Sequence, residues 1–311
     1  MDNPSKRPGR LGVGVIGAGK VGAVLGSALR AAGHAVVGVS AVSARSLDRA
    51  EVMLPGVPVL EVPVVVERAE LVLLAVPDDA LPGLVEGLAE TNTWQPGQLV
   101  VHTSGRYGWR VLEPAVAQGA IPLALHPAMT FTGTSLDLTR LTGACFGVTA
   151  PAAVLPIAQA LVVEMGSEPF VIDEEQRGLY HAALAHGANH LVTLVAQATQ
   201  LLGQAGVENP ARLIGPLLDA ALDNALERGE QALTGPVARG DAGTVRAHLE
   251  AIRRASGPDQ DIVATYRALA RATADRALAG GRLRPEQAES LLDALMGPSD
   301  LRDADERPPG E

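Results

Sequence analysis

The stretch that decides the fold is Leu11–Val39, which reads LGVGVIGAGKVGAVLGSALRAAGHAVVGV. Its first six residues, ending at Ile16, predict a buried strand, and the apolar residues that follow at helical spacing predict a helix ended by Gly33. A second strand is expected over 35–39. Between the first strand and the helix lies the turn GAGKVG, residues 17–22. This order of strand, glycine turn, helix and strand is typical of a dinucleotide-binding βαβ unit.

Each glycine of this turn has its own task in such a unit. Gly17 permits the tight turn, Gly19 lets the backbone approach a pyrophosphate, and Gly22 lets the helix pack closely on the strand. The phosphates then lie at the helix N-terminus, where Lys20 and Val21 also fall. Glycine-rich turns are common, and an ordinary strand–turn–helix is the alternative. The flanking pattern of buried strand and amphipathic helix favours the dinucleotide.

The residues after the second strand indicate which dinucleotide is bound. An NAD site carries Asp or Glu about 20 residues past the glycines, where it holds the ribose 2′-hydroxyl. Here Ser40 takes that position, Ser43, Arg45 and Ser46 follow it, and no acidic residue comes before Asp48. Hydroxyls and an arginine hold a 2′-phosphate that a carboxylate would repel. The sequence therefore favours NADP as cofactor, with Arg45 on a solvated helix face as the alternative interpretation.

Composition excludes several classes of function. The 311 residues carry a formal net charge of −10 and only 3% aromatic side chains, which argues against nucleic-acid binding and against binding to anionic membranes. Cys145 is the single cysteine, so the sequence offers no disulfide framework and no thiolate metal cluster. The first ten residues show no signal-peptide pattern, and glycines break the apolar run after them. We expect a cytoplasmic protein without a membrane segment.

The pattern along the chain predicts two domains. Short apolar runs alternate with helical patterns over residues 11–172, which predicts an α/β fold: a doubly wound, mostly parallel Rossmann sheet. Residues 173–296 read almost wholly as helix and predict an all-α domain for substrate binding and dimerisation. The apolar surplus of Leu191–Leu202 is the reason to expect a homodimer. Residues 1–10 and 297–311 are expected to be disordered.

The expected elements follow these patterns. Further strands are predicted at 57–60, 71–76, 99–102, 121–125, 146–148 and 170–172. Helices are predicted at 151–165, 174–204 (as one long helix), 211–228, 243–254, 262–279 and 285–296.

Polar residues follow three of the predicted strands. Pro77 and Asp78 end one, the string HTSG with Ser104 ends the next, and His126 ends the third. In a doubly wound sheet, ligands bind beyond the carboxyl ends of the strands. Each group taken alone can also have a purely structural role, such as a common turn or a buried histidine whose hydrogen bonds are all made. Three groups at one edge of the sheet favour a site.

The start of the long predicted helix carries a second polar cluster. At about 100° per residue, Asn189 lies about 80° from His181 and about 60° from His186, so these three side chains can share one face. His190 points away from His181 by the same geometry, and no carboxylate accompanies the histidines in the spacing of zinc hydrolases, so no metal site is expected. The alternative is a packed helix whose polar groups are satisfied.

A third cluster is the predicted loop LTGPVARGD at 233–241, in which Gly-Pro and Gly-Asp bracket Arg239. A guanidinium meets a carboxylate in a fork, so an arginine on a rigid loop suits a carboxylate clamp. The alternative is that Arg239 pairs only with Asp241.

Together these strings resemble a known family. They are His102–Gly105, His126–Pro127 with Thr130–Phe131, Tyr180–Ala183 through Asn189, and 233–241 running into Thr244 and His248. Over roughly residues 10–290, the chain resembles bacterial Rossmann-like proteins with a C-terminal helical domain long described only as of unknown function. These proteins resemble the β-hydroxyacid dehydrogenase and pyrroline-carboxylate reductase superfamily, and some are alternative ketopantoate reductases.

The resemblance implies an activity and a set of residues. It implies NADPH-dependent reduction of a small 2-keto acid, with 2-dehydropantoate first among the substrates. The better-known ketopantoate reductases carry a lysine and, eight residues later, an asparagine, and His181 and Asn189 have that spacing. His181 would donate the proton, Asn189 would bind the carbonyl oxygen and Arg239 the carboxylate, with Ser104 and His126 completing the site.

His181 stands where those reductases carry the lysine. Because imidazole titrates near neutrality and lysine does not, the proton donor stays open, and His126 and His186 are the alternatives. Two other functions also stay open. One is a non-catalytic NADP-binding sensor or scaffold, and the other is a reductase of an imine or a short aldehyde.

Overall fold

The computed structural model describes residues 10–256 and 261–296, and the packing of the chain forms two compact units. One unit ends at Ala188 and the other begins at Asn189. The expected disorder at residues 1–9 and 297–311 lies outside the described residues.

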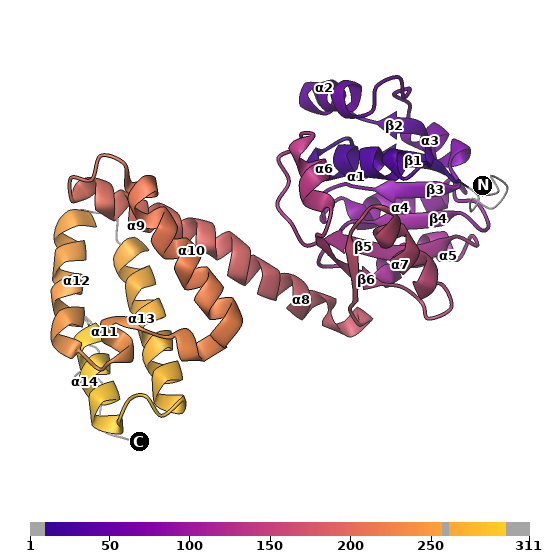
Figure 1. The fold of residues 1–311 in the computed structure, drawn as a ribbon. Coiled ribbons are helices and arrows are strands. Elements are labelled where there is room, and N and C mark those ends of the chain that lie inside the picture. The colour runs from indigo at the N-terminus through magenta and orange to yellow at the C-terminus, as the bar shows by residue number, and fades with distance from the viewer. Residues whose placement is uncertain (1–9, 257–260, 297–311) are drawn as a thin grey trace, which may run out of the picture. The chain divides into compact units, whose positions relative to one another are not determined.

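The first unit is built on a seven-stranded sheet with the order β2-β1-β3-β4-β5-β6-β7 (Figure 1). Its strands are β1 Gly12–Ile16, β2 Ala35–Ser40, β3 Leu71–Leu74, β4 Leu99–His102, β5 Ile121–Pro127, β6 Cys145–Thr149 and β7 Glu168–Val171. Strands β1 to β5 pair in parallel, β6 runs antiparallel to β5, and β7 is parallel to β6. The expected doubly wound, mostly parallel sheet is confirmed.

Helices cover both faces of this sheet (Figure 1). The helices of the first unit are α1 Lys20–Ala31, α2 Ala44–Met53, α3 Val62–Arg68, α4 Leu81–Glu90, η2 Trp109–Leu112, α5 Glu113–Val116, α6 Leu136–Leu141, α7 Leu155–Glu164, η3 Glu174–Gln176 and α8 Arg177–Leu184. The last of them, α8, runs away from the sheet (Figure 1).

Strand alternation divides the core between the two faces. Leu71 and Leu73 of β3 belong to the cluster that includes α1 and α7, whereas Val72 and Leu74 belong to the cluster that includes α3 and α4. All four side chains are buried, which is why the strand reads as an unbroken apolar run.

Two local expectations were wrong. Residues 57–60 form no strand and contribute only an isolated bridge between Val39 and Val59. Pro58 has no N–H to donate, so only its carbonyl takes part, accepting the Val39 N–H at 3.0 Å. The helix predicted from residue 151 begins only at Leu155, after a turn at Pro151.

The second unit consists of helices. They are α9 His190–Gln204, α10 Pro210–Arg228, η5 Gly229–Ala232, α11 Gly235–Ala238, α12 Ala242–Ser256, α13 Asp261–Ala279 and α14 Pro285–Leu295. Its core lies between α11, α12, α13 and α14. Helix α9 buries only Gln197, and no residue of α10 is buried. The segment 233–241, which was predicted to be a loop, contains the short helix α11.

None of the described helices is both long and apolar enough to span a membrane.

The long helix expected over 174–204 is helical throughout but irregular. A π-helical segment, η4 Ala185–Asn189, separates α8 from α9. A π turn holds one more residue than an α turn. The angles assigned at 100° per residue are therefore wrong across this segment, and the shared face of His181, His186 and Asn189 does not follow from their spacing.

Candidate active site

The glycine turn between β1 and α1 has the geometry of a phosphate-binding turn. Gly17 has φ +95°, and a Cβ on Gly22 would lie 2.1 Å from the Gly17 carbonyl oxygen, so both positions require glycine. A Cβ on Gly19 would meet nothing within 4 Å, which leaves open space above the helix N-terminus. These are the three roles that a dinucleotide-binding turn needs.

An open cavity of about 410 Å³ lies beside this turn, at the carboxyl ends of β1, β2 and β3. Six of the predicted cofactor residues line it: Gly17, Gly19, Ser40, Ser43, Ser46 and Pro77. Five others do not line it: Lys20, Val21, Gly22, Arg45 and Asp78. The strand order reverses between β1 and β3, which is where open α/β sheets bind dinucleotides.

Hydrogen bonds to the backbone hold Ser40, at the end of β2, and Ser43, which follows it. The Ser40 carbonyl accepts the N–H groups of Gly17 and Ala18, each at 3.1 Å, which ties the end of β2 to the glycine turn. The Ser43 hydroxyl caps α2 by accepting the Ser46 N–H at 3.2 Å. Arg45 is exposed in the first turn of α2.

A basic side chain that was not among the predicted cofactor residues, Arg49, lies beside the glycine turn. Arg49 donates through Nη1 to the Ala18 carbonyl at 3.3 Å. A Cβ on Gly133 would lie 2.6 Å from Arg49 Nε and 3.0 Å from Lys20 Cγ, so the loop after β5 passes over both basic side chains. Arg49 follows Arg45 by four residues, and this helical spacing was the one signal that pointed to it.

The strand-end residue Ser104 is buried and shapes a loop. Its hydroxyl accepts the N–H groups of Arg106 and Tyr107, each at 3.2 Å, and its own N–H donates to Nδ1 of His102 at 3.2 Å. Nε2 of His102 then carries its proton and donates to the Gly108 carbonyl at 2.8 Å. Burial lowers the pKa of His102 to about 3, so it stays neutral. These contacts make Ser104 and His102 the frame of the loop after β4.

The structure brings together three side chains that could act on a substrate. His126, on β5, lies with Nδ1 at 2.8 Å from the Tyr180 hydroxyl of α8. The His126 ring is edge-on to the rings of Tyr180 and His181, with centroids 5.6 Å and 5.8 Å away. We call His126, Tyr180 and His181 the imidazole–phenol cluster. A Cβ on Gly105 would lie 2.6 Å from His181 Cδ2 and 2.9 Å from His126 Nε2, so only glycine lets both rings pack this closely against the loop after β4.

The cluster is uncharged at His126 and Tyr180. Burial lowers the pKa of His126 to about 4, with smaller contributions from Arg177 and His181. Burial also raises the pKa of Tyr180, so its hydroxyl keeps its proton at neutral pH. Both side chains can therefore donate hydrogen bonds without carrying charge.

Arg177 is the buried cation beneath this cluster. Its side chain is 1% exposed and donates to the carbonyls of Tyr107 at 2.9 Å, Gly147 at 3.1 Å and Ser104. It therefore joins the loop after β4 and strand β6 to the start of α8. Neither Arg177 nor a role for Tyr180 was predicted, because no pattern in the sequence reveals a contact across 70 residues. The one available signal was that Tyr180 stands in the string that carries the resemblance.

The remaining predicted residues belong to the second unit. Asn189 ends the π-helical segment and is exposed, and Arg239 is exposed just after α11. The Asp241 carboxylate accepts from the Thr244 N–H at 3.0 Å and hydroxyl at 2.6 Å, and no ion pair with Arg239 is present in the described part of the chain. Convergence of Asn189 and Arg239 with His181 stays a prediction.

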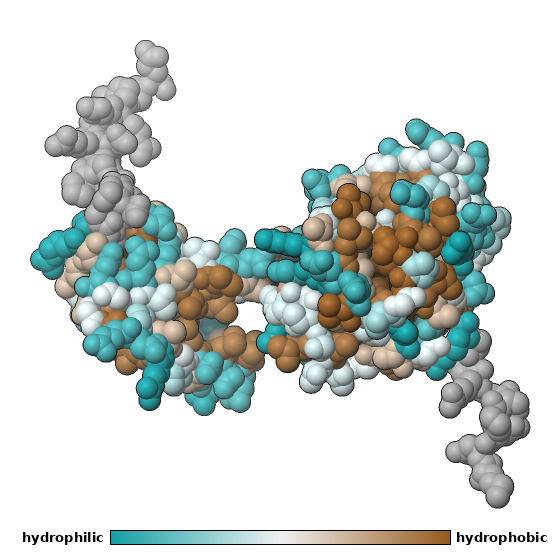
Figure 2. Space-filling model, turned by 90° about the horizontal axis from the view of Figure 1, so that it is seen from above, coloured by the Kyte–Doolittle hydropathy of each residue, from teal (hydrophilic) through white to brown (hydrophobic). Residues whose placement is uncertain are grey.

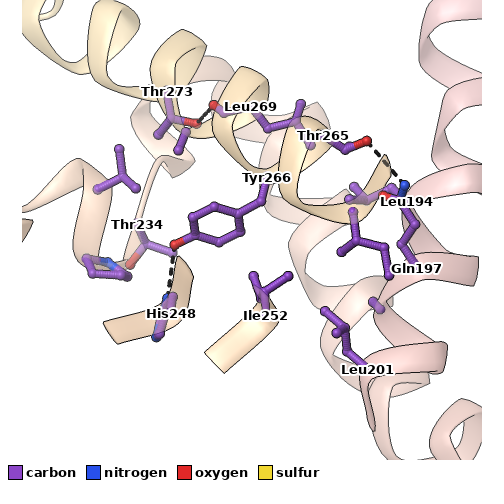
Figure 3. Close-up of a pocket in the computed structure, with 15 residues that line it drawn as sticks. Leu194, Gln197, Leu201, Thr234, His248, Ile252, Thr265, Tyr266, Leu269 and Thr273 are labelled. Carbon is purple, nitrogen blue, oxygen red and sulfur yellow. Dashed lines mark hydrogen bonds between the residues drawn. The ribbon is translucent and has the colours of Figure 1, made fainter. Parts of the chain in front are cut away.

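The second unit contains a cavity of its own, of about 400 Å³ (Figure 3). It is lined mainly by apolar side chains of α9, α12 and α13. Its polar groups pair with one another: His248 Nδ1 lies 3.0 Å from the Tyr266 hydroxyl, and Gln197 donates to Thr265 at 3.2 Å. Neither pair leaves an obvious group to bind a charged substrate.

Two known protein-family models match the chain. Residues 1–127 match the Rossmann-like domain, and residues 144–273 match a domain of unknown function, DUF2520. The resemblance inferred from the sequence is confirmed at this level. No curated protein matches the sequence.

Solved structures share the fold. A candidate NADP oxidoreductase from Bacteroides fragilis is 23% identical, with a TM-score of 0.71 over 86% of this chain and 98% of that one. An imine reductase from Myxococcus stipitatus in complex with NADP+ is 16% identical, with a TM-score of 0.66 over 90% and 99%. A reductive aminase from Aspergillus terreus in complex with NADPH and ethyl levulinate is 17% identical, with a TM-score of 0.61 over 92% and 99%.

Proposed function

We propose that this chain, a Rossmann-like domain followed by a DUF2520 domain, is an NADP(H)-dependent oxidoreductase that reduces a small carbonyl compound. The observation that carries the proposal is the cavity on the glycine turn, at the same edge of the sheet as the imidazole–phenol cluster. Ser40 lines that cavity where an NAD site would carry a carboxylate, which supports NADP. Structural neighbours that bind NADP+ and NADPH add support.

The chemistry divides between the cofactor and the chain. NADPH, when bound, supplies a hydride to the carbonyl carbon. The chain has to orient the carbonyl and give a proton to its oxygen as the hydride arrives. His181 is the proposed proton donor, because its ring lies beside His126 at the carboxyl end of β5, with ring centroids 5.8 Å apart. His181 then regains a proton from solvent, and the product is the alcohol.

For the substrate, we propose a 2-keto acid, with 2-dehydropantoate first. Arg239 is exposed on a short ordered segment, as a carboxylate clamp requires, and Asn189 can donate to the carbonyl oxygen. An imine is the second candidate, because solved structures with this fold include an imine reductase and a reductive aminase.

We further propose that the protein is a cytoplasmic homodimer joined through the helical unit. Apolar side chains of α9 and α10 are exposed there and contribute to the apolar surface coloured brown in Figure 2. Exposed apolar area of this kind marks an interface.

The decisive experiment is NADPH oxidation by the purified protein against a panel of 2-keto acids, imines and short aldehydes, with 2-dehydropantoate included. We expect turnover with at least one 2-keto acid and a lower rate with NADH. Tight NADPH binding without turnover on any substrate would instead support the sensor or scaffold.

A further inference from the structure

The carbonyl of Ala18, in the glycine turn, accepts a hydrogen bond from Arg49 of α2. Ala18 is fully buried, so its backbone groups need partners within the protein. Its N–H donates to the Ser40 carbonyl at 3.1 Å, and its carbonyl accepts from Nη1 of Arg49 at 3.3 Å. Ala18 and Gly19 line the cavity on the glycine turn, whereas Arg49 does not. The guanidinium therefore lies on the side of the turn that faces away from the cavity.

This hydrogen bond determines the direction of the next N–H along the chain. The peptide bond is trans, and in a trans peptide the C=O and the N–H point in opposite directions. With the Ala18 carbonyl directed at Arg49, the Gly19 N–H is directed toward the cavity. The two preceding N–H groups of the turn both donate to the Ser40 carbonyl. Gly19 thus carries the first N–H of the turn that has no partner among the described residues.

The loop after β5 keeps Arg49 in this position. Gly133 has φ +83°, and a Cβ there would lie 2.6 Å from Nε of Arg49, so glycine lets the loop pass directly over the guanidinium. The buried carboxylate of Asp137 holds the loop, because it accepts the N–H groups of Thr132 at 2.8 Å and Gly133 at 2.7 Å. Arg49 is half-buried beneath this loop.

We propose that Arg49 is a positioning residue that keeps the Gly19 N–H directed at the diphosphate of the bound cofactor. The inference rests on the dinucleotide binding of the proposed function and does not depend on turnover. A Cβ on Gly19 would meet nothing within 4 Å, so a phosphate can approach the backbone there. If this peptide rotated, the Ala18 carbonyl would turn its partial negative charge toward the phosphates. NADP and NAD share the diphosphate, so Arg49 should serve both.

The first test compares the two cofactors in Arg49→Met, which keeps most of the length of the side chain and removes its donors. A hydrogen bond to a charged group changes affinity by about tenfold or more, so NADPH and NADH should both bind about tenfold more weakly. Fluorescence titration measures both affinities, and circular dichroism checks the fold. Arg45→Ala should weaken NADPH alone. Unchanged affinities in Arg49→Met, or a loss confined to NADPH, would overturn the inference.

The second test follows the Gly19 amide by NMR of protein labelled with ¹⁵N-glycine, with the signal assigned by its loss in Gly19→Ala. An amide proton that donates to a phosphate resonates at lower field. We expect a downfield shift when NADPH saturates the unmodified protein and a smaller shift in saturated Arg49→Met. A merely structural role of Arg49 would weaken binding without changing the shift at saturation. Equal shifts in the two proteins would therefore overturn the inference.

The loop offers a variant with a matched control. Gly133→Ala pushes a Cβ against the guanidinium, so it should weaken both cofactors. If it acts by displacing Arg49, the double variant with Arg49→Met should bind no more weakly than Arg49→Met alone. Gly143→Ala is the control, because Gly143 has a similar φ of +80° and meets nothing within 4 Å, so affinity should not change. Additive losses in the double variant would count against the inference.

Binding measured in this way is independent of catalysis. Tight NADPH binding without reduction of any substrate would refute the proposed reductase, and the titrations of Arg49→Met would still decide the role of Arg49. Normal turnover together with unchanged cofactor affinity in Arg49→Met would leave the reductase intact and refute this inference. Absence of binding of either cofactor to the unmodified protein would refute both.

Discussion

His181 is the single residue whose loss should separate chemistry from cofactor binding. Its ring packs against Gly105 and beside His126, and it does not line the cavity on the glycine turn. Losing a proton donor commonly costs about 10²–10⁴-fold in rate, so His181→Ala should lower kcat by that factor and leave the NADPH dissociation constant unchanged. Steady-state kinetics and fluorescence titration measure the two quantities. Wild-type turnover in this variant would transfer the donor role to His126 or His186.

Cofactor preference should depend on Ser40 and Arg45. Ser40 lines the cavity, so Ser40→Asp places a carboxylate where a 2′-phosphate would lie. This variant should bind NADPH more weakly and NADH with unchanged affinity. A charge-assisted hydrogen bond is worth about 1.5–3 kcal/mol, so Arg45→Ala should weaken NADPH about tenfold or more. Arg49→Ala is the informative comparison, since Arg49 lies beside the turn. Equal affinity of the unmodified protein for NADPH and NADH would contradict the assignment.

His102 should make the stability of the protein depend on pH. Its pKa is about 3 in the folded state against 6.5 in the unfolded chain, so below pH 6.5 the unfolded state binds the extra proton. The free energy of unfolding should fall as the pH drops from 6.5 towards 3, by about 1.4 kcal/mol per pH unit for this histidine. His126 adds a similar effect down to about pH 4. Urea unfolding at several pH values should show a shallower slope for His102→Gln than for the unmodified protein.

Among the elements, strands were predicted well where both faces are buried. β3 and β4 read as unbroken apolar runs because helices cover both sides of the sheet. The antiparallel direction of β6 was not predicted, because strand direction depends on how a connection folds back and not on which residues are apolar. The π turn at 185–189 was missed for a similar reason, since it inserts one residue without changing composition.

The candidate site was predictable only where it follows strand ends. Ser104 and His126 were selected because parallel strands bring their carboxyl ends to one edge. The roles of their side chains were not predictable. The hydroxyl of Ser104 is used by its own loop, and the partners of His126 come from a helix more than 50 residues later. Arg177 was overlooked because buried arginines are rare, and a sequence gives no sign that three carbonyls surround one.

The β1–α1 turn supports an element-scale prediction from a pair of glycine variants. A Cβ on Gly22 would lie 2.1 Å from backbone, so Gly22→Ala should lower the melting temperature and weaken cofactor binding together. Gly19→Ala meets nothing within 4 Å and should fold normally, yet its Cβ occupies the approach to the pyrophosphate. Thermal unfolding and NADPH titration distinguish the two. Normal NADPH affinity in Gly19→Ala would argue that the dinucleotide does not bind across this turn.

For the whole molecule, the exposed faces of α9 and α10 lead to an expected homodimer. Leu213, Leu217 and Leu226 on α10 are 59%, 68% and 78% exposed. Leu213 and Leu217 share a face because they are four residues apart. In a single protomer these leucines stay exposed to water and contribute no burial energy. In a two-fold dimer the same leucines are buried on both protomers.

Leu217→Glu should therefore weaken the dimer. Burying one leucine is worth roughly 1.5–3 kcal/mol, and two copies contribute, so the dimer dissociation constant should rise about 100-fold or more. Leu136→Glu is the matched control, because Leu136 on α6 is 65% exposed in the other unit and should leave the mass unchanged. Light scattering at micromolar concentration gives the answer. A monomer mass for the unmodified protein would leave the apolar face of α10 without a second copy and reject the dimer.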